Sequence, residues 1–299
     1  MKKYGWITIL SVFILASVAL ADDEYDETNN EGQIEENEKT FQVSAQKPLT
    51  VQLEVTAGEI ELINGNQATQ IRIALEYSKN RYRSTIDMNE KDNHLRVKLI
   101  KRDWHHFHKS DGEHGDDWAK ATIELPTGVD LFIESRLKAG QANMQLGGLR
   151  IKEMEVGEWA GELELDFDSP NLIPMDYLEI NPKIGQANLR NLGNARYKEA
   201  VINGGIGELT VDFSGAVEAD SRAKVDIDIG EATVILPDSI GTRVAIGGGL
   251  SFLSQKQIEG SFSKRGRFYY SKGYDTQKRR CTFYITPGLG ELRVEMGDQ

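Results

Sequence analysis

A five-residue pattern that begins with glycine returns along this chain and limits its fold more than any other feature. The glycine is followed by Glu or Gln, a small or apolar residue, a polar residue and a larger apolar residue. Between residues 133 and 236 the copies are spaced 21, 24, 22 and 23 residues apart. The seven copies begin at Gly58, Gly140, Gly161, Gly185, Gly207, Gly230 and Gly290. Recurrence at this spacing predicts a row of identical structural units.

Apolar residues lie two apart on both sides of each glycine, as on the buried face of a β-strand. In the copy at Gly207 they are Ala200 and Ile202 before the glycine, and Leu209 and Val211 after it. The other copies match these four positions, except that Ser135 replaces an apolar residue in the copy at Gly140. Glycine allows a bend or bulge that a Cβ atom would hinder. Each repeat is therefore predicted to be a strand, a glycine corner and a second strand.

A unit of about 22 residues cannot bury an apolar face alone, whereas stacked units cover one another. We therefore expect an all-β fold of stacked β-repeats, similar to a β-solenoid. The alternative is a β-sandwich built from hairpins with the same alternation. In a stack, the residues that follow the glycines, from Gln141 to Glu231, would form a ladder along one edge. Neighbouring carboxylates in such a ladder repel each other unless cations or amides intervene.

The first 39 residues are predicted to lie outside the repeat domain. Residues 1–21 combine a basic start, an apolar run and a small-x-small end, which is typical of a cleaved signal peptide. Residues 22–39 contain nine acidic residues and one lysine, which predicts an acidic disordered tail. Residues 40–299 would then form one all-β repeat domain. After signal cleavage no apolar run is long enough for a membrane span, so we expect an exported protein that is periplasmic, secreted or at the cell surface.

The charge of the chain indicates which partners to expect, and its cysteine content shows that disulfides do not stabilise the fold. The chain has a net charge of −12, and most of the excess lies in the tail, so the repeat domain is mildly acidic. Such a balance argues against nucleic acid as a partner. Cys281 is the single cysteine, so no intrachain disulfide forms. Alternation places Cys281 on the face of Phe283 and Ile285, and we expect it to be buried.

A histidine-rich segment interrupts the strand pattern between residues 94 and 114. The candidate metal ligands there are His105, His106, His108 and His114, with acidic residues beside them. Imidazole suits zinc, copper or nickel. A solvated loop of biased composition is the alternative interpretation, and no cofactor is predicted for the domain.

A basic and aromatic segment near the C-terminus is the first candidate for partner contact. Arginine and lysine beside aromatic rings can dock an anionic polymer or lipid headgroups. The candidate residues are Lys264, Arg265, Arg267, Phe268, Tyr270, Lys278, Arg279 and Arg280. The alternative is a hairpin whose rings pack on the end of the domain.

Motifs for catalysis, such as G-x-S-x-G, H-E-x-x-H or a phosphate-binding glycine loop, are missing from the sequence. Paired carboxylates are plentiful, so a carbohydrate-active enzyme on a β-solenoid stays open as an alternative, as does a periplasmic metal-binding protein. We interpret the chain as a non-catalytic binding or scaffold protein of the cell envelope, whose partner is an envelope polymer or an envelope protein.

The passage IELPTGVDLFIES, followed by the glycine repeats, resembles the bacterial toastrack, or "putative adhesin", domains of unknown function. The segment DIDIGEATVILPDSIGTRVAIGGG is also similar to the C-terminal domain of the LiaF-like cell-wall-active antibiotic response proteins. Together these resemblances cover residues 40–299. They imply a stacked all-β architecture and an adhesin-like role at the envelope, and they bring no catalytic motif.

Overall fold

The computed structural model describes residues 33–102, 118–248 and 254–297. Strands form nearly all of the regular structure in these ranges, together with two short 3-10 helices, η1 (Leu192–Ala195) and η3 (Tyr274–Thr276). No helix in the described part has the length and apolar character needed to cross a bilayer. The expected signal peptide, most of the expected acidic tail and the four candidate histidine ligands lie outside the described residues.

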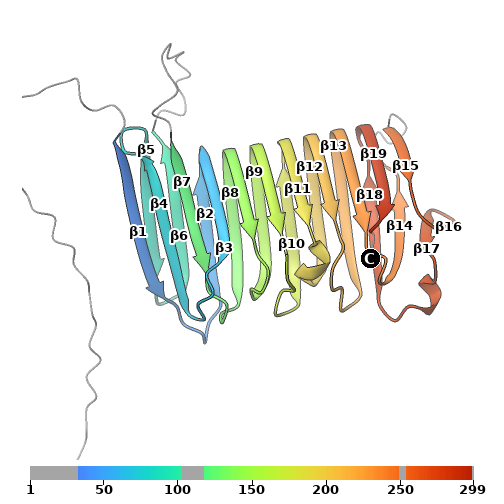
Figure 1. The fold of residues 1–299 in the computed structure, drawn as a ribbon, viewed down its shortest axis with the longest axis horizontal. Coiled ribbons are helices and arrows are strands. Elements are labelled where there is room, and N and C mark those ends of the chain that lie inside the picture. Colours follow the sequence, from blue (N-terminus) through green and yellow to red (C-terminus); the bar gives the residue numbers. More distant parts are fainter. Residues whose placement is uncertain (1–32, 103–117, 249–253, 298–299) are drawn as a thin grey trace, which may run out of the picture. The chain divides into compact units, whose positions relative to one another are not determined.

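The strands stack side by side in two layers, which four long strands join (Figure 1). Each long strand gives its first half to one layer and its second half to the other. The first sheet contains, in spatial order, β5 (Tyr82–Asn89), β6 (His94–Lys101), β2 (Leu49–Val55), the first halves of β8 (Leu131–Gln145) and β9 (Ile151–Asp166), β10 (Met175–Pro182), the first halves of β12 (Tyr197–Asp212) and β13 (Ser221–Leu236), β18 (Arg280–Thr286), β14 (Gly241–Ile246), β17 (Phe268–Ser271) and β16 (Phe262–Arg265).

The second sheet follows the same order on the other side of the core. It contains β1 (Ile34–Gln42), β4 (Gln70–Ser78), β7 (Ala119–Leu125), β3 (Gly58–Asn64), the second halves of β8 and β9, β11 (Ile184–Arg190), the second halves of β12 and β13, β19 (Leu289–Met296) and β15 (Ser254–Ile258). Pairing is parallel through the repeats and antiparallel only toward the ends. Parallel rungs confirm the stacked β-repeat and exclude the sandwich of hairpins.

The four apolar positions of each repeat point into one hydrophobic core. Ile202 and Val211, for example, come from the two halves of β12 and are fully buried. The matching residues of the other repeats belong to the same buried cluster, and even the exception, Ser135, is buried. Stacking removes from water the face that a single repeat would expose, so burial along the whole row stabilises the fold.

The repeat glycines pair with one another and form one column, and the last of them, Gly290, also pairs with Ser254 of β15. Gly58 pairs with Gly140, and the column continues in register through Gly161, Gly185, Gly207, Gly230 and Gly290. All seven have φ between +127° and +146°, a region that L side chains rarely adopt. A Cβ atom on Gly140 would lie 1.8 Å from the carbonyl oxygen of Gly58. Glycine is therefore required at every corner for two reasons, its backbone angle and the close approach of the neighbouring rung.

The order of rungs in space differs from their order in the chain at both ends. After β3 the chain forms β4 to β7 on one side of the first rung and then returns to its other side as β8. After β13 the chain skips one rung position and forms β14 and β15. Strands β18 and β19 later fill the gap, between β13 and those strands.

The boundary expected at residue 39 for the disordered tail is wrong. Strand β1 begins at Ile34, inside the segment for which no ordered structure was expected, and pairs along its length with β4. The pairing satisfies backbone groups, and Arg72 forms ion pairs with Glu38 (2.7 Å) and Glu124 (2.5 Å). Tyr77 also donates a hydrogen bond to Glu35 (2.7 Å). Composition alone predicted disorder because these tertiary partners are distant in sequence.

Candidate functional site

The outward side of the first sheet, at its C-terminal end, carries a dense group of cations and aromatic rings. Phe268 and Tyr270 lie on β17 opposite Ala245 and Arg243 of β14, and β14 pairs in turn with β18, which contributes Tyr284. We call this surface the basic-aromatic face. Its members are Arg222, Lys224, Arg243, Arg265, Arg267, Phe268, Tyr270, Tyr274, Arg280 and Tyr284.

The rings form a chain of edge contacts that holds the cations in place. Phe268 contacts Tyr270 (6.2 Å between centroids) and Tyr284 (6.1 Å), and Tyr270 contacts Tyr274 (4.9 Å). The guanidiniums of Arg243 and Arg267 each lie 5.0 Å from the centre of the Phe268 ring. Arginines packed in this way lose less freedom when they bind a carboxylate or phosphate.

Two further arginines stack on the tyrosines of the same chain of rings. Arg265 lies 4.9 Å from the centre of Tyr270 and also forms an ion pair with Asp275 (2.8 Å). Arg280 lies 5.2 Å from the centre of Tyr274. The basic-aromatic face is therefore an ordered surface of guanidinium groups.

The structure separates the residues that the sequence had grouped. Arg265, Arg267, Phe268, Tyr270 and Arg280 come together as expected. The other three predicted residues do not join them. Lys264 stacks on Tyr269, which packs toward the core and so lies on the opposite side of the hairpin. Arg279 donates a hydrogen bond to the carbonyl of Val217 (3.3 Å), and Lys278 is exposed in the turn before β18.

Five members of the face were not among the residues predicted from the sequence: Arg222, Lys224, Arg243, Tyr274 and Tyr284. The repeat pattern contained part of the signal, because residues six and eight positions before each glycine face outward. Arg222 and Lys224 occupy these positions before Gly230, and Tyr284 does so before Gly290. Arg243 had no such signal, since β14 lies beside β18 only because the chain skips a rung.

The ladder of residues after the glycines forms in register, as expected. Amide groups separate the carboxylates on one side: Gln141 donates to Glu162 (3.0 Å) and Gln186 donates to Glu208 (3.1 Å). Beyond these, Glu208, Glu231 and Glu291 follow one another without an intervening amide. Among the described residues no group of three or more His, Cys, Asp or Glu side chains has an arrangement that could hold a metal ion. His94, the one described histidine, lies 3.0 Å from the amide oxygen of Gln52.

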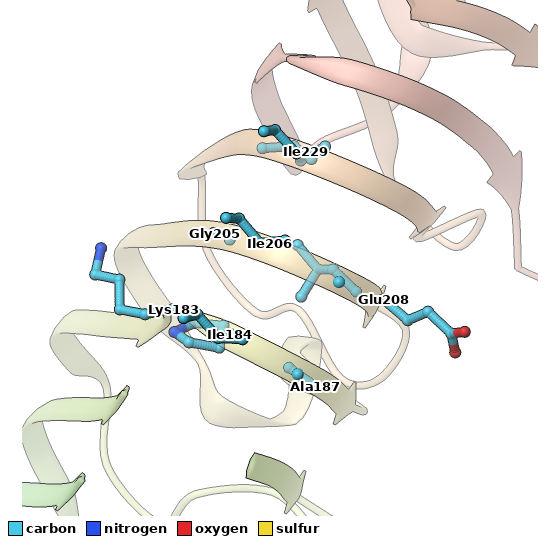
Figure 2. Close-up of a pocket in the computed structure, with 13 residues that line it drawn as sticks. Lys183, Ile184, Ala187, Gly205, Ile206, Glu208 and Ile229 are labelled. Carbon is cyan, nitrogen blue, oxygen red and sulfur yellow. The ribbon is translucent and has the colours of Figure 1, made fainter. Parts of the chain in front are cut away.

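An exposed apolar column runs along the outside of the corner, at the residue before each glycine. Ile184, Ile206, Ile229 and Leu289 pair in register on four neighbouring rungs and are 44–51% exposed. Figure 2 shows the three isoleucines aligned on successive strands, with Glu208 directed away from them. The hollow between these rungs has a volume of about 20 Å³, which holds one water molecule at most. The column is a ridge, and it offers no pocket for a small molecule.

The fold and these surfaces define a class of protein, a two-layer β-solenoid with a charged outer face. Residues 28–172 match the family model for the N-terminal domain of toast_rack, DUF2154. This match confirms the resemblance to the toastrack domains. The structure shows no break at residue 172, because the stacked rungs continue from β9 into β10 and β11 in unchanged register.

Two solved structures of bacterial proteins match this chain at low identity and low TM-score. A "putative cell adhesion protein" from Clostridium sporogenes is 18% identical, with 88% of this chain and 100% of that chain covered and a TM-score of 0.42. A "putative adhesin" from Bacteroides fragilis is 11% identical, with coverages of 87% and 97% and a TM-score of 0.37. A search of curated proteins found no match.

Proposed function

We propose that this protein is a non-catalytic binding module of the cell envelope that holds an anionic polymer on its basic-aromatic face. The observation that carries the proposal is the packing of both Arg243 and Arg267 on the ring of Phe268, with Arg265 and Arg280 on neighbouring rings. Guanidiniums bind carboxylate and phosphate groups in a forked geometry, and a row of them suits a repeating anion. The expected signal peptide would bring the module to the envelope.

A direct binding assay tests the proposal. Purified protein is titrated with polyphosphate and with polygalacturonate, and neutral dextran serves as the negative control. We expect both polyanions to bind and dextran not to bind. Affinity should fall at least tenfold between 50 and 200 mM salt, because the contacts are mainly ionic.

A matched pair of variants locates the site. Arg243→Gln with Arg267→Gln removes two cations from the basic-aromatic face, whereas Arg83→Gln with Arg293→Gln removes two exposed cations from β5 and β19. Only the first pair should weaken polyanion binding. Equal loss from both pairs would mean that net charge alone governs binding and would contradict the proposed site.

A further inference from the structure

The outward side of the first sheet carries a second field of charge, opposite in sign, directly beside the basic-aromatic face. Two rows of side chains cross β8, β9, β10 and β12. In one row Tyr177 lies between Glu153 and Glu199, and in the other Glu179 pairs with Glu155. Glu155 pairs in turn with Glu134. We call these five carboxylates, Glu134, Glu153, Glu155, Glu179 and Glu199, the acidic field.

Few cations neutralise the acidic field from within the chain. Arg136 forms ion pairs with Glu134 and, at 3.9 Å, with Glu155. Within the described residues Glu153 and Glu199 form no ion pair, and both are exposed. The carboxylates also act on Tyr177, whose pKa is raised to about 12 by burial, by its hydrogen bond to Glu179 and by the nearby negative charges. The field therefore has unsatisfied negative charge at its centre.

The change of sign occurs between two adjacent strands. Glu199 of β12 pairs with Arg222 of β13, and Val201 pairs with Lys224. From β13 onward the cations and rings at the outward positions belong to the basic-aromatic face. That face has six cations, of which Lys224 pairs with Asp226 and Arg265 pairs with Asp275. The basic-aromatic face therefore has six cations and two carboxylates, whereas the acidic field has five carboxylates and one cation, Arg136. The excess of positive charge on the first equals the excess of negative charge on the second.

We propose that two copies of this protein pair through this outward side, with the acidic field of each copy on the basic-aromatic face of the other. The pairing requires a twofold axis parallel to the strands at the boundary between β12 and β13, so that the two stacks run in opposite directions. A twofold interface is self-complementary, and a surface with two adjacent fields of opposite sign satisfies this condition in a single copy.

The size of the surface fits a stable pair. Strands β8, β9, β10, β12, β13, β18, β14, β17 and β16 are adjacent along the first sheet. At about 4.8 Å between strands and about 20 Å of strand length, this surface covers roughly 850 Å². Stable interfaces bury about 800 Å² on each partner. Aromatic side chains, which are common at interface centres, occur on both halves of the surface. Phe132 and Tyr177 lie beside Glu153 of the acidic field, and Phe268, Tyr270 and Tyr284 belong to the basic-aromatic face.

The pairing is independent of the proposed function but uses the same cations. A polyanion and the acidic field of a second copy would compete for Arg243 and Arg267. We therefore expect polyphosphate to separate the pair into monomers. Self-association would cover the basic-aromatic face until a polyanion displaces the second copy.

Charge-swap variants test the pairing by sedimentation velocity at 50 mM salt. One variant carries Glu153→Lys with Glu199→Lys, and the other carries Arg243→Glu with Arg267→Glu. We expect the native protein to form dimers at tens of micromolar. Each variant alone should be monomeric, with a dissociation constant raised about 100-fold, because its two substitutions cancel the excess charge of one field and so remove the attraction at both contacts of a pair. An equimolar mixture should form heterodimers, since the unaltered basic-aromatic face of one variant then meets the unaltered acidic field of the other. Circular dichroism melts confirm that each variant is folded.

Two results would overturn the pairing: a native protein that is monomeric at 100 µM and low salt, or variants that dimerise alone as well as the native protein does. Polyanion binding by the variant with Glu153→Lys and Glu199→Lys separates the two proposals. This variant keeps all the cations of the basic-aromatic face, so it should bind polyphosphate whether or not the native protein dimerises.

Discussion

A Cβ atom placed on Gly207 would lie 1.9 Å from the carbonyl oxygen of Gly185 on the neighbouring rung. The positive φ of the corner glycine directs this position along the stack, toward the next backbone. The same relationship repeats at each step from Gly58 to Gly290, so the glycine column sets how closely the rungs approach.

Gly207→Ala should therefore destabilise the protein severely. Strain at φ +138° and overlap with a backbone atom each cost about 1–3 kcal/mol, so we expect a loss of about 2–6 kcal/mol in the free energy of unfolding. Urea denaturation measures it. Gly157→Ala is the control, because an added Cβ there would meet no atom within 4 Å. A similar loss of stability in both variants would contradict a special role for the corner glycine, because it would show that any Gly→Ala change in these strands has the same effect.

Glu158 should make stability depend on pH. The side chain is 3% exposed, and its Oε1 atom has no hydrogen-bond partner among the described residues. Burial, and to a smaller extent the charge of Glu162, raise the pKa of Glu158 from 4.5 to about 7. The folded protein therefore binds this proton more tightly than the unfolded chain does. The stabilisation that this proton gives to the folded state is complete below pH 4.5. It is lost as the pH rises to 7, which lowers the free energy of unfolding by up to about 3 kcal/mol.

Glu158→Leu removes this titration and matches Leu137, which pairs with position 158 on the adjacent rung. We expect the variant to be more stable than the native protein at pH 8 and to show a smaller fall in unfolding free energy between pH 5 and pH 8. Glu158→Gln keeps the polar group and serves as the comparison. An unchanged pH profile in both variants would assign the dependence to other groups.

Cys281 should be unreactive in the folded protein. The thiol is fully buried, as the alternation predicted, and burial raises its pKa to about 11. Ser221 donates a hydrogen bond to its sulfur (3.1 Å), and the hydroxyl of Tyr197 lies 3.8 Å away. We expect labelling with an aromatic disulfide at pH 8 to require unfolding, and one equivalent to react in denaturant. Rapid labelling without denaturant would contradict the buried position.

Two isoleucines of one repeat should differ in their effect on stability. Ile202 lies in the core, whereas Ile206 belongs to the exposed apolar column. We expect Ile202→Ala to cost about 2–5 kcal/mol and Ile206→Ala about 1 kcal/mol or less. Thermal unfolding of the two variants compares them directly. A large loss from Ile206→Ala would mean that the column contributes to folding and is not a free surface.

Glu231→Gln should stabilise the protein slightly at low salt. Glu231 lies between Glu208 and Glu291 in the ladder, without the amides that separate the carboxylates of other rungs. Removing one charge relieves repulsion worth a few tenths of a kcal/mol, which salt screens. Melting curves at 20 and 500 mM salt should show a gain only at the lower concentration. A loss of stability, or a calcium-dependent shift in the native protein alone, would instead indicate a cation in the ladder.

Much of the fold could be predicted because its information is local. The alternation around Gly207, the glycine itself and the repeat spacing identified the rungs, the core positions and the ladder. Part of the candidate site was predictable for the same reason, since Arg265, Arg267, Phe268 and Tyr270 lie on one hairpin. The extent of strand β1 was not predictable, because its order depends on Arg72 and Tyr77 more than 30 residues away.

By itself, the sequence determined the repeat unit, its inward face and the need for glycine at each corner, because side-chain alternation and backbone freedom act within one rung. Only the tertiary structure decided the order of the rungs and the map of charge on the outer face. The late strand β18 enters between β13 and β14, and β19 enters between β13 and β15. The insertion of β18 aligns Arg222, Thr282 and Arg243 in one row. Backbone pairing between rungs is similar for any sequence, so the final neighbours depend on how the ends of the chain pack against the completed stack.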